Sequence, residues 1–186
     1  MRILLVKPGA LERDEAGNIL YASSSVTLII SDRTVVVDTG SADERELVFD
    51  GLKRYGASPD DIEIVVNTHL HEDHTGGNDM FRNADLLSYH TGLREGCILA
   101  RGVSVIETPG HTLDSISVLC MPGSVVIAGD ALPTADNYIK DLPPRIHADR
   151  ALALRSMHRI AGIARIVVPG HGMPFSIPDG HEAELR

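Results

Sequence analysis

The chain has 186 residues, of which 43% are hydrophobic and 23% charged, and its formal net charge is −9. These values are typical of a globular protein, and we expect residues 1–186 to form a single domain. The negative charge, with Lys7, Lys53 and Lys140 as the only lysines, argues against a nucleic-acid partner. The sequence shows neither a membrane-spanning run nor a recognisable signal peptide, so we expect no membrane partner and a cytoplasmic location.

In the first half, apolar runs alternate with turns, which predicts a series of strands. A helix is expected to begin at Ser41, whose hydroxyl can cap it while Glu44 completes a capping box, and to stop at Gly56. A further short helix is expected near residues 76–82. The predicted strands cover residues 2–7, 19–21, 25–31, 34–38 and 62–67.

The second half repeats this pattern and contains one longer helix, from about Ala151 to Ala161, with Asp149 as N-cap and Gly162 as its stop. Cys97 and Cys120 lie in apolar runs and are expected to be reduced core residues. Mixed strand connections and few amphipathic helices favour an α/β fold of four layers, with two sheets face to face and helices outside. The predicted strands are residues 85–89, 96–99, 103–107, 115–120, 124–128 and 165–168.

Histidine and aspartate concentrate in THLHEDHTGG, residues 68–77, directly after the predicted strand 62–67. Three further motifs follow strands: TPGHT presents His111, AGDA presents Asp130 and PGHG presents His171. Each contains glycine or proline, where the backbone turns and a side chain can point into a cleft. Seven potential ligands therefore gather at four strand ends: His69, His71, Asp73, His74, His111, Asp130 and His171.

Imidazole and carboxylate ligands without thiolate suit zinc, iron or manganese, and seven are too many for one tetrahedral ion. We therefore expect two divalent ions, with zinc preferred. We assign His69, His71 and His111 to one ion, Asp73, His74 and His171 to the other, and Asp130 as the bridge. A lone histidine is more often structural, and that interpretation is given to His90, His147, His158 and His181.

Asp38 lies in the turn VVVDTG, outside this set. It either orients a ligand histidine through a hydrogen bond or caps the turn, and the sequence leaves both roles open.

Together, THLHEDHTGG, TPGHT, GD and PGHG resemble the metallo-β-lactamase superfamily of hydrolases, from the VVVDTG turn to His171. The resemblance implies an αββα sandwich with a dinuclear metal site at the edge between the sheets, and all seven ligand positions are intact. One departure is HTLDS, where many members have a proline-glycine pair, so Asp114 is expected to alter that loop.

Within the superfamily, Asp130 stands where the commonest zinc β-lactamases have cysteine, and His71 stands where flavodiiron oxygen reductases have glutamate. The segment between Asp130 and His171 is too short for the domain that RNA-processing members insert. The ligand motif is closest to glyoxalase II, but its helical C-terminal domain has no counterpart here. We therefore expect a minimal, stand-alone hydrolase core.

This resemblance implies a metal-dependent hydrolase of small-molecule esters, thioesters, lactones or phosphodiesters, broad in specificity, that uses a metal-bridged hydroxide. Asp73 is expected to orient the nucleophile as a catalytic residue. The proline-rich segment 131–148 is expected to set specificity. Similarity to lactonases makes Tyr138 a second candidate catalytic residue, with packing as the alternative. His147, Lys140 and Arg145 are further candidate substrate contacts, with solvated surface charge the alternative for the latter two.

Two other functions stay open. The chain could be a mononuclear iron oxygenase resembling persulfide dioxygenases, which share these motifs, or a metal-binding module without turnover. The sequence leaves the substrate, the native metal and the oligomeric state undetermined.

Overall fold

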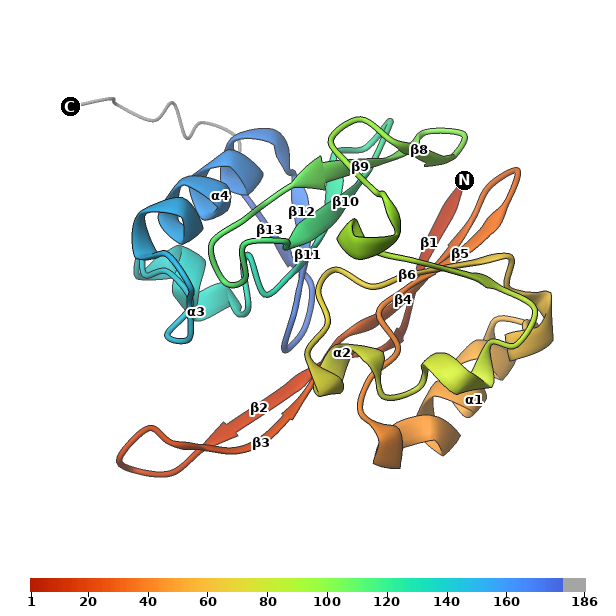
Figure 1. Ribbon diagram of the computed structural model, residues 1–186, viewed down its shortest axis with the longest axis horizontal. Helices are drawn as coiled ribbons and strands as arrows, with labels where there is room; N and C mark the ends of the chain where they lie inside the picture. Colours follow the sequence, from red (N-terminus) through yellow and green to blue (C-terminus); the bar gives the residue numbers. More distant parts are fainter. Residues whose placement is uncertain (179–186) are drawn as a thin grey trace.

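Strands that alternate apolar residues on both faces build two sheets in the computed structural model, which describes residues 1–178 (Figure 1). In the first sheet the order is β1-β4-β5-β6-β7, and the neighbours β5, β6 and β7 are parallel. Its strands are β1 (Arg2–Lys7), β4 (Val26–Ile30), β5 (Thr34–Val37), β6 (Ile64–Val66) and β7 (Asp85–Leu87).

The second sheet has the order β13-β12-β11-β10-β9-β8, and only β11 and β12 are parallel neighbours within it. Its strands are β8 (Ile98–Ala100), β9 (Val103–Glu107), β10 (Ile116–Cys120), β11 (Val125–Gly129), β12 (Ile166–Pro169) and β13 (Phe175–Ser176).

Helices cover the outer face of each sheet, and a hairpin projects away from the sandwich (Figure 1). Helix α1 (Arg45–Arg54) packs on the first sheet and α4 (Arg150–Ile163) on the second. Two short helices, α2 (Glu72–Thr75) and α3 (Ala135–Ile139), lie in loops. The hairpin consists of β2 (Ala10–Arg13) and β3 (Ile19–Ser23).

Three apolar clusters fill the three interfaces between these layers. One lies between the sheets and contains Val35, Val37 and Ile127. Strand alternation sends Val36 to the cluster under α1 and Val126 to the cluster under α4. The predicted four-layer αββα arrangement is therefore confirmed.

Several local predictions are confirmed as well. Ser41 and Glu44 form a capping box at a 3-10 turn that leads into α1, and Gly56 follows the helix at φ 74°. Asp149 caps α4 by accepting a hydrogen bond from the backbone nitrogen of Leu152. Cys97 and Cys120 are free thiols, of which Cys120 is buried.

Other predictions are wrong. Gly162 does not stop α4, because the helix continues to Ile163 with the glycine exposed. The short helix near 76–82 is replaced by α2, which begins inside the histidine-rich stretch, and by a 3-10 turn at Asn78–Met80. Strands β2 and β13 and helix α3 were not predicted.

No helix in residues 1–178 is long and apolar enough to cross a membrane.

Two helical glycines give a matched test of the packing between α1 and β1. A Cβ at Gly51 would lie 2.4 Å from the carbonyl oxygen of Val6, whereas a Cβ at Gly162 has no neighbour within 4 Å. We expect Gly51→Ala to lower the free energy of unfolding by about 1–3 kcal/mol through overpacking. Gly162→Ala should raise it by about 0.5–1 kcal/mol, because alanine favours helix. Urea unfolding measures both, and a stabilised Gly51→Ala variant would contradict the tight contact.

Candidate metal centre

The carboxyl ends of neighbouring strands in both sheets meet at one edge of the sandwich. Asp38 directly follows β5, and the histidine-rich stretch begins two residues after β6. In the second sheet, Asp130 follows β11 and His171 lies two residues after β12. Side chains released at these points face each other between the sheets, so residues far apart in sequence form one cluster.

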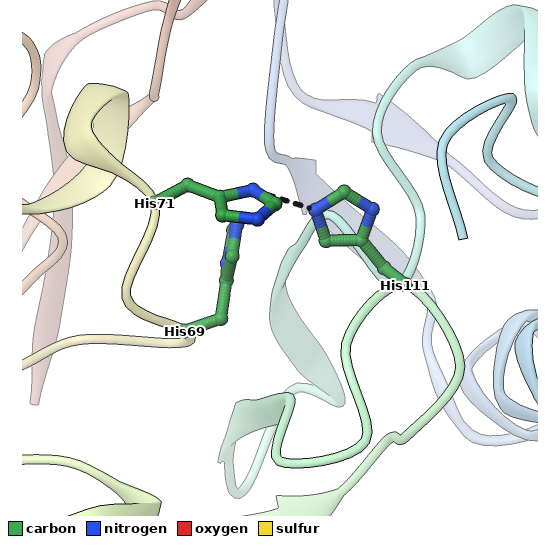
Figure 2. A group of neighbouring side chains, drawn as sticks. All are labelled: His69, His71 and His111. Atoms are coloured by element: carbon green, nitrogen blue, oxygen red, sulfur yellow. Dashed lines mark hydrogen bonds between the residues drawn. The ribbon is translucent and has the colours of Figure 1, made fainter. Parts of the chain in front are cut away.

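Three histidines form the first group of this cluster (Figure 2). His69 and His71 come from the loop after β6 and His111 from the turn between β9 and β10, and one ring nitrogen of each lies within 4.8 Å of the others. The Nε2 atom of His111 is 3.0 Å from Nδ1 of His71. This is the set that the sequence assigned to one ion.

Asp73, His74 and His171 form the second group, again with ligand atoms within 4.8 Å of one another. The Oδ2 atom of Asp73 lies 3.8 Å from Nε2 of His74 and 3.7 Å from Nε2 of His171. This is the set that the sequence assigned to the other ion.

Asp130 lies between the two groups. Its Oδ1 atom is 3.4 Å from Nε2 of His74 and 3.2 Å from Nε2 of His171, whereas its Oδ2 atom is 3.5 Å from Nε2 of His111. The glycine at position 170 leaves room for the Asp130 carboxylate, because a Cβ there would lie 2.0 Å from Oδ1 of Asp130. Each carboxylate oxygen thus faces one group, as a bridging ligand requires.

Hydrogen bonds hold the histidine rings with Nε2 toward the centre. The Nδ1 atom of His74 lies 2.8 Å from Oδ2 of Asp38, and that of His111 lies 2.7 Å from the carbonyl of Ile146. The Nδ1 atom of His171 lies 2.9 Å from the carbonyl of Ser23. Since these acceptors place the proton on Nδ1, the lone pair of Nε2 is directed at the cluster.

The residues fit a bound cation. Within residues 1–178, three buried atoms of the cluster have no hydrogen-bond partner: Nε2 of His69, Nε2 of His74 and Oδ1 of Asp130. Unpaired buried polar atoms are costly, and bound metal ions would satisfy all three. Nitrogen and carboxylate donors of this kind are those that zinc, iron and manganese take.

Charge in the cluster also favours a cation. Burial disfavours the charged form of Asp130, but the imidazoles of His171 and His74 outweigh it and hold the pKa of Asp130 well below its usual range. Burial likewise opposes a charged His74, but the carboxylates of Asp38 and Asp130 outweigh it and raise the pKa of His74 well above its usual value. The two buried carboxylates therefore create a site that stabilises positive charge.

Asp38 performs the first of the two roles that the sequence left open, that of orienting a ligand histidine. It orients His74, and it also accepts hydrogen bonds from the backbone nitrogen and the hydroxyl of Thr68, both at 2.8 Å. Its φ of 53° belongs to the left-handed region, so the turn itself is strained to place the carboxylate. A carboxylate directly after a buried strand was the sequence signal for this residue.

A buried ion pair behind the second group was not predicted. Lys7 Nζ lies 3.0 Å from Oε2 of Glu44 and donates to the hydroxyl of Ser23 and the carbonyl of Ser24. Burial alone would raise the pKa of Glu44, but hydrogen bonds from Ser23 and Lys7 outweigh it and lower that pKa. The backbone of Ser23 and Ser24 in turn contacts His171 and Asp73. The pair therefore supports the strand end that carries these contacts.

The remaining predicted candidates lie outside the cluster. Tyr138 is half-buried in α3, where its ring stacks on Phe175 with centroids 5.8 Å apart, and it is not among the described residues that line the cleft. These contacts fit the alternative of packing. His90 pairs with Asp114 in the loop that departs from the family pattern.

Two further histidines have local partners: His158 lies 2.6 Å from Asp141, and His147 bonds to the carbonyl of Pro144. His181 lies outside the described residues.

A cleft leads from the solvent to the cluster. A small pocket of about 110 Å³ is lined by His71, Asp73, His111, Asp130 and His171 together with residues of the β2–β3 hairpin and of the segment 131–148. It adjoins a larger pocket of about 960 Å³, lined by the same segment and by residues after His171. The segment predicted to set specificity does lie at this cleft, but α3 makes part of it helical.

Comparison with known proteins shows which family most of the chain resembles. A model described as the metallo-beta-lactamase superfamily matches residues 21–85 and 98–171. A protein named probable metallo-hydrolase from Methanocaldococcus jannaschii is 39% identical over 144 residues, covering 74% of this chain and 70% of the relative. An N-acyl homoserine lactonase of Bacillus thuringiensis is 30% identical over 158 residues, covering 69% of this chain and 63% of the relative.

A solved structure shows the same fold. The B. thuringiensis AiiA mutant with N-decanoyl-L-homoserine bound at its active site has a TM-score of 0.68 at 22% identity. The alignment covers 91% of each chain.

Asp38 should control metal affinity without touching a metal. We expect Asp38→Ala to weaken metal binding about tenfold to a hundredfold, because His74 loses the acceptor that fixes its tautomer. Asp38→Asn should be nearly as damaging, since an amide nitrogen facing Nδ1 of His74 moves the imidazole proton to Nε2. Competition with a chromophoric chelator measures the affinity, with Asp60→Asn, an exposed carboxylate, as the control. Unchanged affinity in both Asp38 variants would exclude the orienting role.

Replacing one partner of the Lys7–Glu44 ion pair should lower the free energy of unfolding far more than replacing both. Both side chains are more than nine-tenths buried. We therefore expect Lys7→Met to lower the free energy of unfolding by about 3 kcal/mol or more, because it leaves the Glu44 carboxylate buried and unpaired. The double variant Lys7→Met/Glu44→Gln should recover part of this loss. Urea unfolding of both, and of Glu44→Gln alone, forms the cycle, and additive losses would show that the two side chains do not interact.

Proposed function

The chain belongs to the metallo-beta-lactamase superfamily and is one of its metal-binding hydrolases, and on that premise we propose that it works through a dinuclear centre. The bonds cleaved are those of esters, thioesters, lactones or phosphodiesters. The observation that carries the proposal is the position of Asp130, with one oxygen toward each of two complete three-ligand groups. Seven side chains of these types are more than one tetrahedral ion can bind.

Three ligand groups occur in the cluster, and we assign one ion to each of the two that share no residue; the third group, His69, His74 and Asp130, overlaps both. One ion would be held by His69, His71 and His111 and the other by Asp73, His74 and His171, with Asp130 between them. Two bound divalent ions supply Lewis acidity and a water of lowered pKa. Zinc is our first choice, with iron or manganese compatible with the same donors.

The chain's own residues complete the chemistry. Asp73 is the more exposed of the two carboxylates in the ligand groups and lines the small pocket, so its carboxylate can orient the nucleophile. Hydrogen bonds at Nδ1 hold the rings of His74, His111 and His171 in place, so these histidines would serve to position the ions. The open, mostly apolar larger pocket would receive the rest of the substrate.

A small-molecule lactone, ester or thioester is the substrate class that this cleft supports best. The lactonase of B. thuringiensis acts on N-acyl homoserine compounds according to its name, and its structure holds a ligand of this type at the active site. With Tyr138 turned toward Phe175, the candidate contacts in the segment 131–148 that line the larger pocket are Lys140, Arg145 and His147. Broad rather than narrow specificity is expected from an open cleft with few groups to reject a substrate.

Metal content and a variant of Asp73 test this proposal together. We expect protein purified without chelator to hold about two transition-metal ions per chain. Asp73→Asn should lower kcat on a panel of aryl esters, lactones and thioesters by about a hundredfold or more, with unfolding little changed. Asp79→Asn, an exposed carboxylate paired with Arg45, is the matched control and should stay within about twofold of wild type.

Three outcomes would contradict parts of the proposal. A fully active protein with one ion would remove the dinuclear assignment. Iron alone, with oxygen consumption on glutathione persulfide and no hydrolysis, would favour the oxygenase. A loaded protein that turns over nothing on the panel would favour a binding module.

A further inference from the structure

The two pockets are parts of one cleft, and two arginines stand at their junction. Six residues line both pockets: Leu11, Arg13, Pro133, Pro144, Arg145 and His171. Arg13 ends strand β2 of the hairpin, and Arg145 lies in the segment 131–148 across the cleft. A substrate that reaches the metal ligands through the larger pocket therefore passes both guanidinium groups.

The larger pocket is basic although the chain is acidic overall. Arg13, Lys140, Arg145 and Arg150 line it, whereas the formal net charge of the chain is −9. One carboxylate lines it, that of Asp136, and it lies 2.5 Å from Lys140. Within residues 1–178, no carboxylate that lines the larger pocket is therefore paired with the arginines there.

Both arginines at the junction donate to the same backbone oxygen. Nη1 of Arg13 lies 3.1 Å, and Nη1 of Arg145 2.5 Å, from the carbonyl of Gly17 at the hairpin tip. Gly17 has φ 81°, and a Cβ there would lie 2.0 Å from Nη1 of Arg145, so only glycine allows this approach.

In the described part of the chain neither guanidinium forms an ion pair. Two like charges drawn together on one neutral acceptor retain most of their N–H donors for a ligand. Such paired guanidinium groups favour carboxylate or phosphate oxygens, with which each can form two hydrogen bonds.

We propose that the cleft selects substrates that carry an anionic group, a carboxylate or a phosphate, at a distance from the scissile bond, and that Arg13 and Arg145 bind this group. Leu11, Pro133 and Pro144 give the apolar wall between the arginines and the metal ligands. This inference rests on the proposed function for the cleaved bond, and it narrows the substrate class within that function. The alternative is that the arginines only tie the hairpin to the segment 131–148.

A pair of esters that differ in one charge tests the proposal. The probes are an aryl hemisuccinate and its methyl ester, which is neutral. We expect wild type to prefer the anionic ester by about tenfold or more in kcat/KM, because charge-assisted hydrogen bonds to arginine are strong. Arg13→Gln and Arg145→Gln should each reduce this preference to less than about threefold, mostly through KM. Arg155→Gln, an exposed arginine on α4, is the control and should keep it.

Binding without turnover separates this inference from the proposed function. Calorimetric titration of the metal-loaded protein with succinanilate, the amide analogue, and with its methyl ester reports on the anionic group alone. Tighter binding of succinanilate by wild type, lost in Arg145→Gln, supports the inference even if no ester is cleaved, and in that case the proposed function fails by itself.

Three results overturn the inference. The first is equal binding of the two analogues by wild type. The second is a preference that survives both arginine variants, since the metal ions would then hold the anion. The third is an equal loss of activity on both esters in Arg13→Gln and Arg145→Gln, which is the signature of a purely structural tie.

Discussion

Hydrogen bonds of Thr68 join the two sheets, and the arrangement of the candidate metal centre depends on this contact. On one side, the Asp38 carboxylate at the end of β5 accepts hydrogen bonds from the nitrogen and hydroxyl of Thr68. On the other, the carbonyl of Thr68 accepts from Ile116 of β10. The Thr68 side chain also occupies the space beside Gly129, where a Cβ would lie 2.4 Å from its hydroxyl. Thr68 therefore links the sheet that carries the histidine-rich stretch to the sheet that carries Asp130, in addition to the apolar cluster between them.

This contact helps to explain how loops can bring the seven candidate ligands into one well-defined cluster. The loops that carry these residues start at the ends of buried strands, and three of the histidines are held at Nδ1 by acceptors on other elements: Asp38 for His74, Ile146 for His111, Ser23 for His171. Rotation of any of these rings would break its hydrogen bond, and for His74 and His171 that bond is buried. The ion pair behind Ser23 extends the same support away from the cleft.

Local patterns were sufficient to predict most strands, both long helices and the residue types of the cluster. Apolar alternation, helix caps and ligand motifs each involve residues that are close together in sequence. Contacts between distant segments were beyond such patterns. Thr68, Ser23 and the Lys7–Glu44 pair have roles that exist only when the strands are assembled. The cap of α3 was readable, since Thr134 accepts from Asn137, but the surrounding prolines outweighed it. Gly162 lies in α4 because nothing near it requires a left-handed residue.

The hairpin, of which only β3 was predicted from the sequence, has a role separate from that of the candidate metal centre. The ligands are fixed by the two sheets, whereas β2, with the segment 131–148, forms much of the cleft wall. A substitution in these two elements can change which substrate is accepted while the Thr68 contact and the Nδ1 acceptors other than Ile146 stay in place. Conversely, the gathering of Arg13 and Arg145 on Gly17 serves no ligand of the cluster. Since like charges repel, an anion bound at the mouth of the cleft would stabilise this arrangement of the two arginines.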